Sequence, residues 1–378
     1  TSDWVILNDN QSDTFSGYDN LTLKTRVNQY RYVKVKDQEI CQLVLENTPF
    51  YPEGGGQSGD KGKLVFENNN ELLITDTKKE NGKILHFSKK PDFDISCNVK
   101  AYVDSFVRNE CSSNHSSTHL LHQALRNVLG NHVEQKGSSV TPEGLRFDFS
   151  HFKKIDDDQI KEIETYVNNR IDDSIELEEN RNENYNTAID NGAIGLFGEK
   201  YGKTVRTIKF GDSYELCGGT HVRNTMNIRN FLIISESSIA SGIRRIEAIS
   251  GKKSINYLSD RNNEINQLKS ILSSNKGTVD SVRNLKNENS ELSKTLKKSQ
   301  KKLTQFYSEH FLQKFKKVEA TYLLIEKVEM DNDLMRSLSF DLINKIRDSI
   351  IIFYSKDSNN LNIICNVSKT LNDNIKID

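Results

Sequence analysis

The stretch that organises the sequence around it is HSSTHLLHQALRNVLG, residues 115–130. Its apolar residues recur at helical spacing and Gly130 supplies a stop signal, so the stretch predicts an amphipathic helix. His115 and His119 are one helical turn apart, which places both imidazoles on one helix face. Such a pair can share a metal ion, although it is also common by chance. An HExxH protease site is ruled out, because Ser116 stands where the general-base glutamate is needed.

A second pair of metal-ligand residues lies much further along the chain, in the stretch CGGTH, residues 217–221. Its two glycines allow a tight turn, so Cys217 and His221 can face one point. Together the two pairs offer three nitrogen donors and one sulfur donor, a set that suits zinc. The sequence therefore predicts one zinc ion per chain, bound by His115, His119, Cys217 and His221. A catalytic and a structural role for the ion both stay open, because four protein ligands close a zinc site.

The residues before the helix predict an all-β region in a chain whose overall class is α+β. A connecting segment, residues 1–20, precedes period-two alternation and dense turns over residues 21–104, which predict a small antiparallel β-barrel. Helix and strand signals then alternate over residues 105–251, which predicts an α+β domain that contains the zinc site. Within it, a charged helix is expected from Ile155 to about Glu178.

The residues after 251 change character again. Heptad-like spacing of apolar residues over residues 252–316 predicts a long coiled-coil-like helical hairpin, or two lightly kinked helices, around a turn at residues 275–277. Residues 317–378 predict a small α/β unit that stops short of completion. The heptads would serve a homodimer, through the helical or the C-terminal part, as well as an intramolecular hairpin. Both chain ends read as cuts in a longer protein.

Composition excludes several classes of protein. The chain has 378 residues, of which 35% are hydrophobic and 28% charged, with a net charge of −1. No apolar run is long enough to span a bilayer and no signal-peptide pattern is visible, so no membrane partner is expected. The five cysteines are unclustered and odd in number, which indicates a reducing, cytoplasmic location. A nucleic-acid ligand would need local basic surface, because the whole chain is not basic.

Several motifs, in this order, resemble the second half of alanyl-tRNA synthetases and their free-standing editing relatives. They are TPFYPEGGGQSGDKG (48–62), HSSTHLLH (115–122), QKGS (135–138), RFD (146–148), ELCGGTHV (215–222) and SGIRRIEA (241–248). The resemblance implies a zinc-dependent esterase that removes serine or glycine from mischarged tRNA(Ala). It implies a parent protein that is an ATP-dependent alanine–tRNA ligase of protein biosynthesis, whose aminoacylation motifs are absent here.

The resemblance also assigns roles by position. It supports the four zinc ligands and places Thr118 and Gln135 in an editing pocket as candidate catalytic residues. It implies that a tight loop lies near the tRNA acceptor end, formed by Gly54, Gly55, Gly56 and Gln57. Arg244 and Arg245 either contact tRNA phosphates or pair with Glu247 and other carboxylates as structure, and His122 serves packing or tRNA contact.

Two other functions compete with this interpretation. One is a free-standing editing protein with a helical extension. The other is a non-catalytic tRNA-binding or oligomerisation module whose zinc is structural. The chain also departs from the family near Met226 and Arg229, where glycine is usual, so a bulkier turn is expected there.

Overall fold

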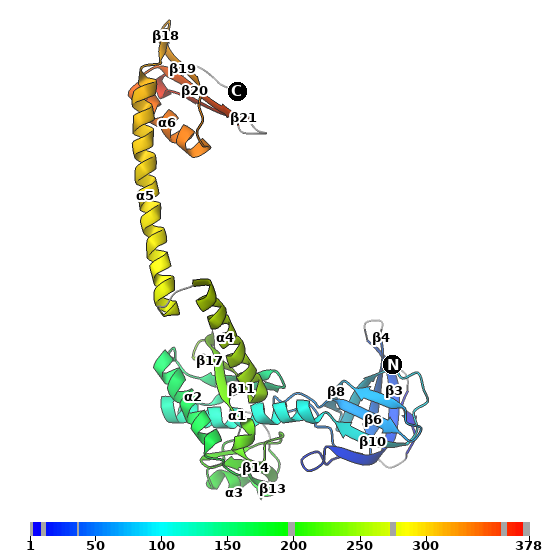
Figure 1. Ribbon diagram of the computed structural model, residues 1–378. Helices are drawn as coiled ribbons and strands as arrows, with labels where there is room; N and C mark the ends of the chain where they lie inside the picture. Colours follow the sequence, from blue (N-terminus) through cyan, green and yellow to red (C-terminus); the bar gives the residue numbers. More distant parts are fainter. Residues whose placement is uncertain are drawn as a thin grey trace. The chain divides into compact units, whose positions relative to one another are not determined.

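The computed structural model describes residues 3–8, 13–35, 38–195, 201–272, 277–356 and 361–372 (Figure 1). The chain divides into two compact units, residues 1–262 and 263–378. Helices and mainly antiparallel sheets occur in both units, so the predicted α+β class is confirmed.

The first unit begins with an eight-stranded sheet of order β7-β6-β10-β3-β4-β9-β8, to which β1 adds by pairing with β3. Its strands are β1 (Val5–Ile6), β3 (Thr22–Val35), β4 (Gln38–Leu45), β6 (Gly62–Phe66), β7 (Glu71–Ile74), β8 (Asp76–Glu80), β9 (Lys83–Lys89) and β10 (Asn98–Val103). Alternate residues turn inward into one core, which includes Val27, Leu43, Leu64 and Ala101. The same region of the chain contains a separate two-stranded parallel sheet, formed by β2 (Thr14–Phe15) and β5 (Asn47–Thr48). Closure of the large sheet into a barrel stays a prediction.

Helix α1 (Ser105–Leu129) follows the sheet and contains the histidine pair. It begins well before the predicted start at His115. At its true start, the Asp104 side chain accepts hydrogen bonds from the N–H groups of Phe106 and Val107. Its first half has no apolar stripe, because buried polar residues such as Ser112 and Asn114 pack there. The helix ends at the predicted Gly130, whose φ is 115°.

Two further sheets and several short elements complete the first unit. One sheet has the order β11-β12-β17-β16 and the other β13-β14-β15. The elements are β11 (Gln135–Thr141), β12 (Gly144–Ser150), α2 (Asp157–Asp172), β13 (Glu178–Asn184), α3 (Tyr185–Asp190), β14 (Thr204–Phe210), β15 (Ser213–Leu216), the 3-10 helix η1 (Thr225–Ile228), β16 (Phe231–Ala240), β17 (Ile243–Ser250) and the start of α4 (Gly251–Leu272). Apolar residues of α1, α2 and both sheets share one core, which includes Leu121, Leu125, Phe147, Ile163 and Phe210.

The predicted helix from Ile155 to Glu178 is too long. Helix α2 ends at Asp172, and Ser174 then adopts a left-handed φ of 55°. Glu178 instead begins β13, which pairs with β14. Strand β13 consists of polar residues only, so it is recognised by that pairing and not by an alternating pattern.

The second unit contains α5 (Thr278–Leu312), α6 (Asn332–Lys345), a four-stranded sheet and the short helix α7 (Lys369–Asn372). The strands lie in the order β18 (Lys316–Val318), β19 (Thr321–Lys327), β20 (Ser349–Lys356) and β21 (Leu361–Val367). Strands β19 and β20 are parallel, as a helical crossover by α6 requires. The heptad leucines of α5, such as Leu292 and Leu296, are exposed in the single chain. Residues 275 and 276 of the predicted turn lie outside the described residues.

Among the residues that the structure describes, no helix combines the length and the apolar character that crossing a bilayer requires.

The buried His86 of β9 gives a testable pH dependence. Its Nδ1 lies 3.2 Å from the Leu43 carbonyl oxygen and its Nε2 2.7 Å from Thr48 Oγ1. Burial lowers the pKa of His86 from its ordinary 6.5 to about 4. The unfolded chain therefore binds more protons between these values, so the stability that His86 contributes is complete above pH 6.5 and is lost as pH falls toward 4. We expect a loss of about 2.5 kcal/mol between pH 7.5 and 4.5.

Urea unfolding followed by the fluorescence of Trp4, the only tryptophan, measures this loss in the first sheet. A His86→Gln variant should be less stable at pH 7.5 but should show a shallower dependence on pH. Parallel pH curves for the two proteins would contradict the assignment to His86.

Candidate metal centre

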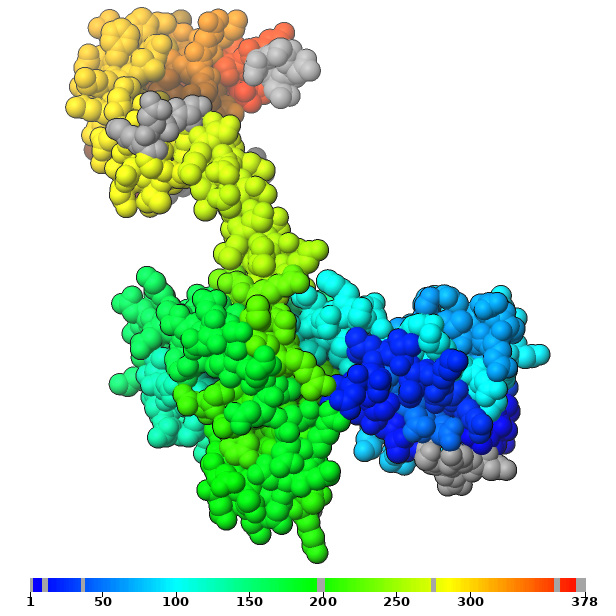
Figure 2. Space-filling view, turned by 60° about the horizontal axis from the view of Figure 1, so that its bottom comes forward, coloured from blue at the N-terminus to red at the C-terminus, as the bar shows by residue number. Residues whose placement is uncertain are grey.

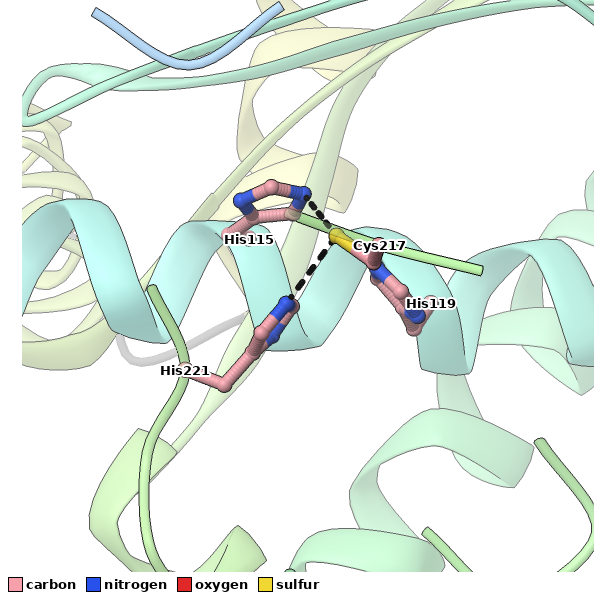
Figure 3. A group of neighbouring side chains, drawn as sticks. All are labelled: His115, His119, Cys217 and His221. Carbon is pink, nitrogen blue, oxygen red and sulfur yellow. Dashed lines mark hydrogen bonds between the residues drawn. The ribbon is translucent and has the colours of Figure 1, made fainter. Parts of the chain in front are cut away.

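Helix α1 and the loop after β15 bring the four predicted ligands together (Figure 3). His115 and His119 project from adjacent turns of α1, and Cys217 and His221 come from the loop. Their ligand atoms all lie within 4.8 Å of one another. Cys217 Sγ is 3.4 Å from His115 Nε2 and 3.3 Å from His221 Nε2. Four donors in so small a space form a candidate site for one ion.

The spacing and chemistry of these donors fit zinc. Ligand atoms held tetrahedrally at zinc–ligand distances of about 2.0–2.3 Å lie roughly 3.3–3.8 Å apart, which matches the two sulfur–nitrogen distances. The Gly219 N–H donates a hydrogen bond to Cys217 Sγ at 3.4 Å, which favours the thiolate. Burial lowers the pKa of all three imidazoles, those of His115 and His221 well below the ordinary value. Neutral imidazoles have the free lone pair that a metal requires.

The glycine at 219 is needed for a steric reason. A Cβ at that position would lie 2.0 Å from Cε1 of the His115 ring, whereas a Cβ at Gly218 would meet nothing within 4 Å. Close approach of the loop to the histidine, rather than a tight turn, therefore explains Gly219, whereas the surrounding space would admit a side chain at position 218.

Each histidine has a polar partner at Nδ1, a hydrogen-bond partner for His115 and His221 and the Glu215 carboxylate for His119, which leaves Nε2 for a metal. His115 Nδ1 lies 2.8 Å from Gln57 Oε1, His119 Nδ1 3.3 Å from Glu215 Oε2, and His221 Nδ1 3.1 Å from Ser116 Oγ. Such partners fix the tautomer and the ring orientation of a metal ligand. Nothing local in the sequence indicates this role for Glu215 and Ser116, and the role predicted for Gln57 was a different one.

His122 also belongs to this arrangement through Glu215. Its Nδ1 lies 2.9 Å from Glu215 Oε1, and its ring packs 5.3 Å from that of Phe147. Burial by itself would raise the pKa of Glu215, but the imidazoles of His119 and His122 outweigh it and lower that pKa. An ionised Glu215 accepts a hydrogen bond from His122 and lies 3.3 Å from His119 Nδ1. His122 therefore packs behind the ligands, as one of its two predicted roles stated.

A cavity of about 530 Å³ opens beside the ligands, and both predicted pocket residues line it. Thr118 Oγ1 donates to the Asn114 carbonyl at 2.8 Å, so toward the cavity it offers lone pairs only. Gln135 Nε2 donates to Ser138 Oγ at 3.0 Å and retains its amide oxygen as an acceptor. The cavity also borders His115, His119 and Cys217. Polar acceptors and candidate metal ligands therefore face one space.

The glycine-rich loop is as tight as the sequence predicts and contacts β11. Gly54 and Gln57 exchange two backbone hydrogen bonds, of 3.1 and 3.0 Å. Gly56 has φ of 80°, and a Cβ on it would lie 2.7 Å from the Ser138 carbonyl oxygen. The Val140 N–H then donates to the Gly56 oxygen at 2.8 Å. The loop needs glycine at 56 for both conformation and space.

The N-terminal segment also reaches the metal loop, which is the loop after β15 that contains Cys217 and His221. Tyr18 donates its hydroxyl to the Gly218 carbonyl oxygen at 2.6 Å, and Asp19 pairs with Arg181 at 2.6 Å. Figure 2 shows dark blue atoms of this segment meeting green atoms of the later region.

Arg244 and Arg245 form ion pairs within the sheet. Arg244 is 9% exposed and its Nε pairs with Glu236 of β16. Arg245 makes two bonds to Asp148 of β12, of 2.7 and 2.8 Å. These contacts agree with the alternative that the two arginines pair with carboxylates as part of the structure. The partners are Glu236 and Asp148 rather than the predicted Glu247. A buried, paired Arg244 offers little to a tRNA phosphate, and the tRNA contact of the two arginines stays a prediction.

The turn at Met226 and Arg229 is strained where the resemblance implies glycine. Arg229 has φ of 71°, a left-handed value that glycine adopts easily and arginine rarely. Its N–H donates to the Met226 carbonyl oxygen at 3.1 Å, which closes η1. The turn thus retains a glycine-like backbone with a bulkier side chain.

Comparison with known proteins places these features in a family. The family model described as threonyl and alanyl tRNA synthetase second additional domain matches residues 205–247, which include Cys217 and His221. The model described as tRNA synthetases class II (A) matches residues 2–107, which cover the first sheet. Both models describe aminoacyl-tRNA synthetases.

Individual relatives narrow this class. An alanine–tRNA ligase of Christiangramia forsetii is 43% identical over 370 residues, which are 98% of this chain and 42% of that protein. Those of Flavobacterium psychrophilum and Bacteroides fragilis are each 41% identical, over 98% and 93% of this chain and 43% and 40% of their own length. The chain belongs to the alanyl-tRNA synthetase family, and the predicted resemblance is confirmed. It spans about two fifths of the length of the curated relatives it matches.

Proposed function

We propose that this chain performs the editing reaction of its family, the zinc-dependent hydrolysis of serine or glycine from mischarged tRNA(Ala). The observation that carries the proposal is the donor set His115, His119, Cys217 and His221 beside a cavity lined by Thr118 and Gln135. Serine and glycine differ from alanine by one small group, which a synthetic site rejects by only about 10–200-fold. A separate site that hydrolyses the mistakes supplies the missing selectivity.

The residues around the cavity have distinct parts in this proposal. Zinc bound by the four ligands would place positive charge beside the ester, and Lewis-acid contact with the ester would require that one ligand position be exchangeable. Thr118 accepts a hydrogen bond from the serine hydroxyl or from the amino group, because its own proton is held by Asn114. Gln135 accepts a second bond from the aminoacyl group through its amide oxygen. Alanine has no side-chain hydroxyl to offer Thr118, so it is held less well than serine; this contact favours serine and does not distinguish glycine from alanine.

The tRNA partner and the surroundings belong to the same proposal. Exposed lysines follow one another on α5, at 297, 298, 301 and 302, and offer a local basic surface for RNA in a chain of net charge −1. The exposed leucines of α5 would serve a homodimer. All five cysteines are free thiols, in keeping with a cytoplasmic location.

A second candidate is favoured by the closed donor set. Four protein ligands are typical of structural zinc, so the chain would then be a tRNA-binding module without hydrolytic activity.

Single-turnover deacylation separates the two candidates, with Ser-tRNA(Ala) and Ala-tRNA(Ala) as substrates and with zinc-loaded and chelator-treated protein. We expect zinc-dependent loss of serine and retention of alanine. Zinc-loaded protein that binds tRNA but leaves both esters intact would establish the second candidate.

A further inference from the structure

We propose that Gln57 is a positioning residue of the metal centre, by which the glycine-rich loop of the first sheet sets the affinity of the site for its ion. The proposal rests on the metal site of the proposed function but not on deacylation. Gln57 lies between β5 and β6 and its residue is 0% exposed. Its position far from every ligand in the sequence gives no local sign of such a role.

The side chain of Gln57 bridges the two ligand-bearing segments. Its Oε1 lies 2.8 Å from His115 Nδ1 on α1. The same oxygen accepts a hydrogen bond of 2.9 Å from the N–H of Thr220, which belongs to the metal loop. Its Nε2 donates to Thr220 Oγ1 at 2.9 Å. One amide therefore contacts the helix that supplies two ligands and the loop that supplies the other two.

The direction of these bonds fixes the state of His115. A backbone N–H can only donate, so the atom that receives the Thr220 N–H is the amide oxygen of Gln57. An amide oxygen can only accept, so His115 carries its proton on Nδ1. The lone pair then resides on Nε2, the atom that lies 3.4 Å from Cys217 Sγ. Gln57 thus selects the tautomer and the ring orientation that a metal ligand needs.

The loop holds Gln57 firmly in this place. Its neighbours bond to β11 on both sides, from Val140 N–H to Gly56 oxygen at 2.8 Å and from Ser58 N–H to Val140 oxygen at 2.9 Å. On the far side, a Cβ at Gly219 would lie 2.9 Å from Gln57 Oε1. The amide therefore has little room to rotate away from His115.

Zinc affinity of the purified chain tests the proposal, measured with zinc alone by competition against a chromophoric chelator. Gln57→Met removes both amide atoms at similar volume, and we expect a 10–100-fold weaker site. Gln57→Glu retains oxygen acceptors for His115 and Thr220 and should recover affinity to within a few-fold of the parent. Gln42→Met is the matched control, because Gln42 is a buried glutamine of the same sheet that bonds Arg31. It should leave zinc affinity unchanged.

The visible spectrum of the cobalt-substituted protein supplies a readout that loss of stability alone does not move. Gln57→Met should change the intensity of the cobalt bands, because the His115 ring is no longer held, whereas Gln42→Met should not. If Gln57→Met fails to fold, Gln57→Asn withdraws the oxygen by one methylene and gives the same comparison. Parent-like affinity and spectrum in the Gln57 variants would overturn the proposal. Absence of deacylation in a zinc-loaded parent would overturn only the proposed function.

Discussion

Replacing Cys217 with alanine is expected to lower the zinc content and the editing activity together. Cys217 supplies the sulfur of the donor set, and its Sγ lies within 3.4 Å of two imidazole nitrogens. Four-ligand zinc sites bind with about 10–16 kcal/mol, so loss of one ligand removes ~3 kcal/mol, which is on the order of a hundredfold in affinity. Zinc content by atomic absorption and single-turnover deacylation of Ser-tRNA(Ala) measure the two effects.

Cys365→Ala is the matched control for this change. Cys365 is an exposed free thiol of β21 in the second unit, so its loss should alter neither zinc content nor activity. A Cys217→Ala protein with full zinc would remove Cys217 from the ligand set. Full activity with depleted zinc would instead separate the hydrolysis from the metal.

The local motifs predicted the ligands well because their information is short-range. The pair on α1 is fixed by helical periodicity, so sequence spacing alone places both imidazoles on one face. The first half of α1 could not be found in this way. Asn114 there is buried because its Oδ1 accepts bonds from the N–H and hydroxyl of Ser250, a residue from the far end of the domain. A polar helix face that bonds to distant residues looks like solvent-exposed surface in the sequence.

Pairing between strands explains the remaining differences. The partner of Arg245 is Asp148 because β12 and β17 pair with these two residues in register. The sequence offered Glu247 only because it is close in the chain. Strand β13 depends in the same way on β14. Gln57 meets His115 only after the loop between β5 and β6 has packed against α1. Register and packing between sheets are long-range properties that one sequence does not reveal.

Arg108→Met is expected to destabilise the first unit by about 3–5 kcal/mol, the usual cost of leaving a buried charge without its partner. The Arg108 guanidinium is buried on α1 and pairs with Asp60, which is 1% exposed. It also donates to the carbonyl oxygens of Gly17 at 2.6 Å and Pro49 at 2.8 Å. Methionine would leave all three acceptors without this donor. Urea unfolding followed by Trp4 fluorescence measures the change.

Lys63→Met tests whether burial is the cause. Lys63 of β6 pairs with Glu71 of β7 at 2.7 Å, but both side chains are exposed. The loss of stability in this variant should therefore stay below about 1 kcal/mol. Equal losses from the two variants would refute the argument from burial. Pro49 and Asp60 also lie at the two ends of the loop that contains Gln57. Arg108 therefore binds both ends of that loop to α1. Zinc affinity should therefore fall in Arg108→Met and stay unchanged in Lys63→Met, which links the stability of this contact to the metal centre.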